Sequence, residues 1–431
     1  MIKKMLMLIL SCVCTSLYAY TGDDLFGDIA RIFKHHSKKE ITSVYNKIID
    51  ERILFQHTFV PTFEVVKQSL QEDEIAIESF SFPEDNGRIK YIAFSVRSNY
   101  DAPHVCELFN EDELNPLLET GEAMFKNTIV SSLLLEPLRE ELIGVKKIFF
   151  TPSGKLHLFA IEYCNVESGA MLAENYQFYR LTSSGIIAHK RNKLKHFNNY
   201  AIWGGIDYDT PPIFEEKYVR KSTRCQMGYL QDSYLAALDI YQSLKEKGLK
   251  GIMYANEQAT EQSFKEIPNQ GIQLLLIETH GVNNPNDIVT KYPTALMLAG
   301  SSYVMDGGIV PCGYEDGLLF YEEIASLDLS TIDIAVISAC KSALGDIDWK
   351  GVNGLMRGFK TAGVNTLVMT TDDVVDYVSG EVWKSFFHNI TEGMSKRASL
   401  LEAIKHVKTI HEGFYQSPKF WTPFVLVDGI D

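Results

Sequence analysis

The chain has 431 residues, of which 45% are hydrophobic and 23% charged, so it is long enough to bury the cores of two or three ordinary domains. Its 41 basic and 56 acidic side chains give a formal net charge of −15 at pH 7. This charge argues against a general nucleic-acid binder and against a protein that binds anionic membranes, because both need clustered positive charge. The composition favours basic or polar partners.

The first residues are arranged like a secretory signal. Two lysines follow Met1 and Ile2, an apolar run covers 5–10, and mostly small residues lead to Ala19. We therefore predict that 1–19 is a signal peptide and that the protein is exported, either periplasmic or secreted. A membrane anchor is the alternative, but no later stretch reaches the roughly 20 apolar residues of a membrane-spanning helix, so we expect no transmembrane domain after signal removal.

Two of the seven cysteines, Cys12 and Cys14, fall within the predicted signal. The other five show no CxxC spacing and no accompanying His-x₃-His motif, so we expect no metal site and no cofactor. Their odd number leaves at least one thiol unpaired, and such a thiol in an exported protein is either buried or chemically active. These five are Cys106, Cys164, Cys225, Cys312 and Cys340.

The pattern changes twice along the rest of the chain. Residues 20–60 have the spacing of one or two helices, above all over 40–55, and 61–195 combines short apolar or alternating segments with a helical insert at 115–142. We interpret 61–195 as a mixed α+β, sheet-rich subdomain. Its strands are expected at 73–82, 89–96, 146–151 and 156–163.

Residues 196–431 alternate apolar strands with helices, which is typical of a mostly parallel sheet covered on both faces. One helix is expected over 232–248, where Asp232 can cap, Gly248 ends the helix, and four apolar residues fall on one face. That face consists of Leu235, Leu238, Tyr241 and Leu244. The strands are expected at 201–206, 250–255, 272–279, 332–339, 364–371 and 423–429.

Two chemically distinctive residues stand just beyond two of these strands. His280 follows "LLLIET", and Cys340 follows "IAVISA". In a parallel sheet, catalytic groups gather beyond the carboxyl ends of the strands, and consecutive strands joined by a crossover are usually neighbours. The imidazole and the thiol are therefore expected on adjacent loops.

This pairing suits acyl transfer. An imidazole that accepts the thiol proton raises the fraction of reactive thiolate and can later protonate the departing amine. The negatively charged oxygen of the intermediate needs amide donors, for which the backbones of Gly281 and Cys340 are candidates. Each residue also has an ordinary interpretation, since a cysteine after an apolar strand is commonly a small buried hydrophobe and a histidine there a structural hydrogen bonder.

Several ordered segments resemble the CHAT domain, a caspase-like domain often found with tetratricopeptide repeats. They are "ETHG" from Glu278, "DGLLFYEEIASLDLSTIDIAVISACKSALGD" from Asp316, "GVNGLMRGFKTAGVNTLV" from Gly351 and "FWTPFVLVDG" from Phe420. The resemblance extends over roughly 61–431. It implies an α/β, caspase-hemoglobinase-like fold and a cysteine endopeptidase, with His280 and Cys340 matching the family's catalytic pair.

The substrate pocket departs from the pattern of relatives that cleave after arginine. These often hold an acidic residue two places before the cysteine, where this chain has Ser338. Asp372, with Asp373, lies at the mouth of the neighbouring strand, and an anion there could face a basic substrate side chain. The alternative is that both aspartates cap the helix that follows.

We therefore predict an endopeptidase with a Cys-His dyad acting on a protein or peptide substrate, with room for an activating or repeat-containing protein partner. The alternative is a catalytically silent caspase-like scaffold or protein-interaction module. A hydrolase of small esters is a third hypothesis, which the absence of a G-x-S-x-G motif weakens.

Overall fold

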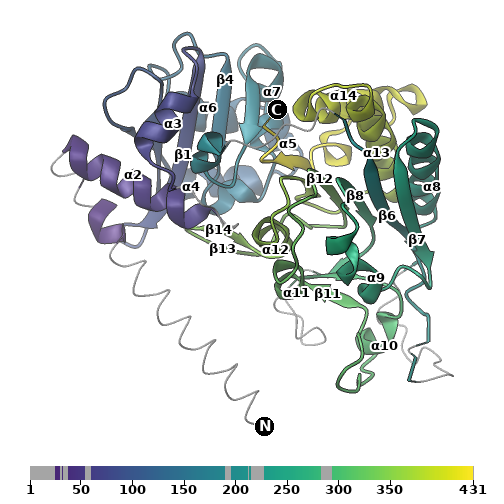
Figure 1. The fold of residues 1–431 in the computed structure, drawn as a ribbon. Coiled ribbons are helices and arrows are strands. Elements are labelled where there is room, and N and C mark those ends of the chain that lie inside the picture. The colour runs from purple at the N-terminus through teal and green to yellow at the C-terminus, as the bar shows by residue number, and fades with distance from the viewer. Residues whose placement is uncertain are drawn as a thin grey trace.

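The computed structural model describes most of the chain (Figure 1). The described residues are 25–29, 32, 37–53, 60–189, 196–211, 213–214, 228–282 and 294–430. The predicted signal peptide lies outside these ranges, so export stays a prediction. Within them, no helix is both long enough and apolar enough to cross a membrane.

A single eleven-stranded sheet, in the order β3-β2-β1-β4-β5-β16-β15-β12-β8-β6-β7, forms the centre of the described molecule. Seven of its strand pairs are parallel, and the pairs β1–β2, β2–β3 and β15–β16 are antiparallel. Helices flank the sheet, which confirms the predicted α/β class. The strands of this sheet are β1 (Glu74–Pro83), β2 (Ile89–Val96), β3 (His104–Asn110), β4 (Lys147–Thr151), β5 (Gln177–Arg180), β6 (Asn199–Ile206), β7 (Lys250–Asn256), β8 (Leu274–Glu278), β12 (Ile334–Ser338), β15 (Thr366–Thr370) and β16 (Phe424–Val427).

The other elements lie on or beside this sheet. Two small sheets contain β9 (Gly281–Val282), β10 (Ala295–Met297) and β11 (Leu318–Phe320), and β13 (Asp346–Asp348) with β14 (Gly351–Asn353). The longer helices are α2 (Lys38–Arg52), α8 (Gln231–Glu246), α13 (Asp376–Thr391) and α14 (Lys396–Thr409). The shorter ones are α3 (Phe63–Ser69), α4 (Glu111–Leu118), α5 (Ala123–Lys126), α6 (Ile129–Leu135), α7 (Leu172–Asn175), α9 (Glu261–Lys265), α10 (Ser302–Met305), α11 (Tyr321–Ala325) and α12 (Leu355–Thr361). Short 3₁₀ turns include η1 (Gly154–His157), η2 (Ile161–Tyr163) and η3 (Ser184–Ala188).

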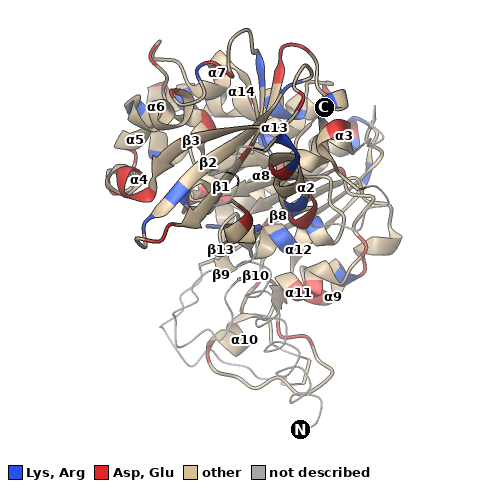
Figure 2. Cartoon of the chain, turned by 90° about the vertical axis from the view of Figure 1, so that its left-hand side faces the viewer, with Lys and Arg blue, Asp and Glu red and all other residues tan. Residues whose placement is uncertain are grey.

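The sheet joins the N-terminal and C-terminal halves of the chain. Strand β16, from the C-terminal half, pairs with β5 of the N-terminal half at Val427 and Arg180 and with β15 on its other side. The predicted boundary near 195 lies at residues outside the described ranges, and the division into 61–195 and 196–431 stays a prediction. On the face seen in Figure 2, acidic and basic residues are interspersed over both halves of the sheet and its helices.

One strand prediction is wrong. Residues 156–163 form the turns η1 and η2 instead of a strand. Apolar residues can be buried from turns as well as from strands, and Leu156 and Ile161 are both buried in the core although they lie in turns. The turns bring Glu162 inward to pair with Arg180 of β5, with its carboxylate 2.7 Å from Nη2.

The apolar face predicted for α8 is buried only in part. Leu244 is buried and Tyr241 packs against the core, but Leu235 is 48% exposed, whereas Ala236 and Ala237 are buried against the neighbouring elements. A Cβ at Gly204 of β6 would lie only 2.7 Å from that of Ala237, and one at Gly380 of α13 only 2.8 Å from that of Ala236. The backbones approach so closely that small residues, and not leucines, must line this interface.

The start of α8 is capped from another helix. Asp232 does not cap it, because the backbone N–H groups of Asp232 and Ser233 donate to the carboxylate of Asp376, at the start of α13. The predicted end is confirmed, since Gly248 adopts a left-handed conformation directly after the helix.

Candidate functional site

The loops that carry His280 and Cys340 lie side by side at the carboxyl edge of the sheet. Strands β8 and β12 are parallel neighbours, and their last residues, Glu278 and Ser338, stand opposite each other. Each candidate residue lies two positions beyond its strand, and the N–H of Thr279 donates to the Ser338 carbonyl at 3.0 Å. The structure therefore brings the two predicted residues to one shared rim.

The backbones of the two loops touch at Gly281. A Cβ at this position would lie 2.8 Å from the carbonyl oxygen of Cys340 and 3.4 Å from the Cβ of Ala339. No side chain fits there without moving the loop that carries Cys340. The two backbone segments expected to supply oxyanion donors are thus held together, whereas their role in catalysis stays a prediction.

The imidazole of His280 is held in one orientation. Its Nε2 lies 2.8 Å from the carbonyl oxygen of Gly228, which only accepts, so Nε2 carries the proton and donates it. The ring of Tyr208 packs beside it at a centroid distance of 5.1 Å. With Nε2 as the donor, Nδ1 is the nitrogen available to take a proton.

Tyr208 supports the histidine from the buried side. Its hydroxyl lies 3.1 Å from Oγ1 of Thr279, and burial raises the pKa of Tyr208 to about 12. The phenol therefore stays protonated at neutral pH and adds no charge beside His280.

Glu278 ends β8 behind His280 and is fully buried. Burial raises its pKa well above the usual range, and the nearby carboxylate of Asp376 raises it further. Neither of its side-chain oxygens has a hydrogen-bond partner among the residues that the structure describes. Burial therefore favours the protonated, uncharged form of this carboxyl group.

The Cys340 thiol is half-buried and faces the loop after β15. Burial raises its pKa above the ordinary value, a backbone hydrogen bond from Val374 opposes this shift, and the carboxylate of Asp373 raises the pKa further while Lys341 lowers it. Within the described ranges, no hydrogen bond joins the thiol to His280. The two residues share a rim, but the thiol is engaged by Asp373 and Val374.

The two aspartates proposed for substrate binding lie beside this thiol. Asp372 and Asp373 are 70% and 69% exposed, and their carboxylates lie 3.8 and 3.1 Å from Nζ of Lys341. Neither caps α13, because the N-cap position is Val375 and no side-chain cap is formed. Both aspartates therefore form part of the rim, where they already face a cation of the protein itself.

A family model for the CHAT domain matches residues 128–428. The chain belongs to the CHAT domain family. The resemblance seen in its sequence is thereby confirmed, and the match includes both His280 and Cys340. No curated protein matches this CHAT domain.

Solved structures of two peptidases are similar to this CHAT domain at low identity. The Arg-specific cysteine proteinase gingipain R (RgpB) of Porphyromonas gingivalis is 10% identical with a TM-score of 0.43, and the match covers 69% of this chain and 66% of that one. Separase, in the Saccharomyces cerevisiae separase–securin complex, is 12% identical with a TM-score of 0.41, and the match covers 69% of this chain and 17% of that one.

Opposite charge changes at the rim are expected to move the reactivity of Cys340 in opposite directions. Asp373→Asn removes an anion that disfavours the thiolate, so alkylation by iodoacetamide at pH 7 should rise about two- to five-fold. Lys341→Met removes a cation that favours the thiolate and should slow the reaction. The measurement is a pH–rate profile followed by peptide mapping of Cys340, and shifts in the same direction for both variants would contradict this account.

The sequence analysis did not find three residues of this site. Tyr208 lies two positions past the end of β6, which is the neighbour of β8, so the rule that located His280 applies to it as well. Lys341 was not singled out, although its position next to Cys340 places it at the rim. The carbonyl of Gly228 comes from a distant segment, and no sequence pattern indicates it.

One carboxylate group of this CHAT domain has the spacing of a metal site. The carboxylates of Glu261, Glu315 and Glu323 approach within 4.8 Å of one another. The ammonium group of Lys265 lies 2.5 to 2.8 Å from all three and fills the place of a cation. This group therefore reads as a structural ion-pair cluster.

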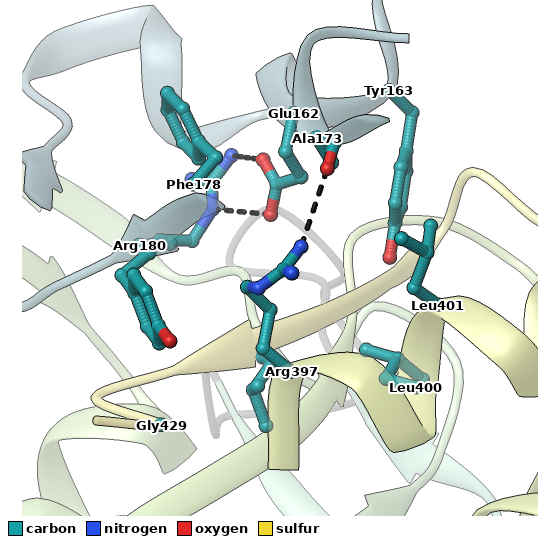
Figure 3. A pocket seen from close by; sticks show the side chains of 11 residues that line it. Glu162, Tyr163, Ala173, Phe178, Arg180, Arg397, Leu400, Leu401 and Gly429 are labelled. Atoms are coloured by element: carbon teal, nitrogen blue, oxygen red, sulfur yellow. Dashed lines mark hydrogen bonds and ion pairs between the residues drawn. The ribbon is translucent and has the colours of Figure 1, made fainter. Parts of the chain in front are cut away.

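A pocket between β5, α7 and α14 lies away from the rim (Figure 3). Arg180 donates to both oxygens of Glu162, and Arg397 donates to the carbonyl of Ala173 across the pocket at 3.2 Å. None of the predicted site residues lines it. These charges hold α14 to the N-terminal half and suggest no chemistry.

Proposed function

We propose that this CHAT domain is a cysteine endopeptidase that cleaves protein or peptide substrates through an acyl-enzyme intermediate. The observation that carries the proposal is the placement of His280 and Cys340, each two residues beyond paired strand ends on one rim. Family membership supports it, because the matched segment includes both residues, which the resemblance in the sequence assigns to the family's catalytic pair.

The reaction follows from the orientation of the imidazole. Nδ1 of His280 takes the thiol proton, and Sγ of Cys340 attacks the carbonyl carbon of the scissile amide. Backbone N–H groups of Gly281 and Cys340 are the proposed donors to the tetrahedral oxyanion. The protonated imidazole gives its proton to the departing amine, and water then hydrolyses the thioester with His280 as the base.

Before attack, the thiol must turn away from Asp373 and towards His280. In the resting arrangement, burial and the carboxylate of Asp373 both keep the thiol protonated. A substrate or an activating protein partner that displaces this contact would complete the dyad. The resting site is thus arranged for latency.

The rim aspartates are the proposed determinants of substrate preference. Asp372 and Asp373 present two exposed carboxylates on the loop after β15, and both face Lys341, the residue that follows Cys340. Two anions against one cation leave a net negative charge, which favours an arginine or lysine before the scissile bond. A substrate cation must compete with Lys341 for these carboxylates.

A non-catalytic interaction module is the second candidate. The observation that favours it is the engagement of the thiol by Asp373 and Val374 with its raised pKa. In a scaffold that kept His280 and Cys340 only for packing, the thiol would stay engaged by Asp373 and Val374 at all times.

A fluorogenic peptide panel separates the two candidates. The wild type should cleave peptides with arginine or lysine before the scissile bond faster than those with alanine, Asp372→Asn should narrow this difference, and Cys340→Ala should cleave none. Cys312→Ser, which removes an exposed thiol elsewhere, serves as the matched control and should retain full turnover.

Cleavage that survives in Cys340→Ala would refute the peptidase mechanism. A wild type that turns over no peptide or protein substrate, yet binds a protein partner equally well with and without Cys340, would favour the scaffold. Equal cleavage after alanine and arginine, unchanged in Asp372→Asn, would remove the aspartates from substrate recognition.

A further inference from the structure

A two-stranded hairpin follows the nucleophile loop directly. Residues 341–345 lead from Cys340 to β13, and Trp349 and Lys350 form the turn between β13 and β14. The carboxylate of Asp348 accepts the N–H groups of Lys350 and Gly351 at 2.7 and 3.1 Å. The turn is therefore locally well defined, so its position depends on what holds the hairpin as a unit.

The C-terminal end of α2 contacts this turn (Figure 1). Arg52 is 1% exposed, and its Nε and Nη2 donate to the carbonyl oxygen of Trp349 at 3.0 and 2.7 Å. Next to it, the carboxylate of Glu51 lies 2.5 Å from Nζ of Lys350. Two consecutive residues of α2 thus bind two consecutive residues of the turn.

Further contacts fix the guanidinium itself. Nη1 of Arg52 donates to the buried carboxylate of Glu78 at 2.5 Å, and the guanidinium lies 5.6 Å from the ring of Phe80. The ring of Trp349 packs beside the same phenylalanine at 6.0 Å. The hairpin is therefore attached to β1 through α2 and not only to its own half of the molecule.

A small cavity lies beneath the hairpin. Its volume is about 20 Å³, and it has Lys350 and Val352 of the hairpin on one side and Ala343 and Thr371 on another. Val352 is buried on this side, and the contacts with α2 add a second attachment at the turn.

The loop after Cys340 is held by β15 and, further along, by the hairpin. Lys341 has φ of +54°, a left-handed conformation that an L-residue with a side chain adopts only when its surroundings enforce it. Strand β12 holds the chain before this residue. After it, Ser342 and Ala343 are bonded to Thr370, and Gly345 lies against Asn353 of the hairpin, where a Cβ would meet the Asn353 carbonyl at 2.2 Å.

We propose that the end of α2 is a latch on the nucleophile loop, in which Glu51 and Arg52 are positioning residues that hold the β13–β14 hairpin and, through it, the resting direction of the Cys340 side chain. Both residues lie outside the segment 128–428 that matches the family. The proposal rests on Cys340 as the reactive thiol and extends the machinery of the site to the N-terminal helical segment.

The test removes the ion pair between Glu51 and Lys350 and leaves the buried Arg52 unchanged. Glu51→Gln and Lys350→Gln each remove the ion pair, and Glu51→Lys with Lys350→Glu restores it with reversed charges. Alkylation of each cysteine by iodoacetamide is followed by peptide mapping as a function of pH. Lys38→Gln is the matched control, because its ion pair with Asp101 ties the opposite end of the same helix.

Each single variant is expected to raise the alkylation rate of Cys340 at pH 7 by about three- to ten-fold and to move the midpoint of its profile to lower pH, because a loosened loop moves the thiol away from Asp373. The charge-reversed pair should return to the wild-type rate, and Lys38→Gln should not differ from wild type. Peptide turnover should rise in kcat, with KM little changed, because the contact with Asp373 that keeps the thiol protonated is released.

Cys164, which is fully buried, reports general opening of the protein. The latch is refuted if Cys164 is labelled in parallel with Cys340, if the single variants behave like the wild type, or if Lys38→Gln has the same effect. Because alkylation needs no substrate, these outcomes are readable even for a protein that turns over no peptide, and failure of the peptidase proposal is thereby distinguished from failure of the latch.

Discussion

Replacing His280 by alanine is expected to lower kcat for peptide cleavage by about 10²- to 10⁴-fold, because the thiol then has no partner to take its proton or to protonate the leaving amine. KM should change little, since the imidazole acts on the reacting atoms. The measurement is steady-state kinetics on the best substrate of the peptide panel, together with a pH–rate profile of kcat.

The alkylation profile of Cys340 provides a second, independent measurement on the same variant. In the resting structure the reactivity of the thiol is set by burial, by Val374 and by the charges of Asp373 and Lys341. His280→Ala should therefore leave the alkylation midpoint close to that of the wild type while turnover collapses. His388→Gln, an exposed histidine on α13, is the control. Unchanged kcat in His280→Ala would exclude the dyad.

The second large effect is expected on stability. Arg52→Met should lower the free energy of unfolding by about 3–5 kcal/mol, because it leaves the carboxylate of Glu78 buried without its cation. Glu78 is 0% exposed and would keep only the N–H of Ser184 as a donor, at 2.7 Å. Urea denaturation followed by circular dichroism measures the loss.

Two comparisons separate the buried charge from the loss of the side chain. Arg52→Met combined with Glu78→Met should recover much of the stability, since replacing both partners removes the uncompensated charge. Arg88→Met breaks an ion pair with Asp112 in which both side chains are exposed, and it should change the free energy of unfolding by about 1 kcal/mol or less. An equally small effect of Arg52→Met would show that Glu78 finds another partner.

Much of the C-terminal half of the fold could be predicted because its strands are recognisable from short stretches of sequence. Apolar runs such as 272–279 are buried strands in any parallel sheet, and a crossover connection makes successive strands neighbours, which placed His280 and Cys340 on one rim. The same reasoning, applied to the strand ending at Ile206, would have included Tyr208.

The remainder depends on contacts between distant segments. Neither the pairing of β16 with β5 nor the attachment of Trp349 to Arg52 leaves a periodic signal, because each joins segments far apart in the chain. The apolar face of α8 is buried only in part for a related reason, since Leu235 stays exposed while the close approach of Gly204 and Gly380 requires alanines at the buried positions. The interaction of the Cys340 thiol with Asp373 likewise joins two loops that are distant in the sequence.

The position of β16 has a consequence for the order in which the protein is assembled. This strand comes last along the chain, yet it lies in the middle of the sheet, between β5 and β15. While a ribosome is still making the residues up to Val427, the two parts of the sheet have no shared strand, and the rim beside β15 lacks its outer neighbour. A newly made chain can therefore complete the rim that carries the proposed dyad only after β16 has been translated and has paired with β5 and β15.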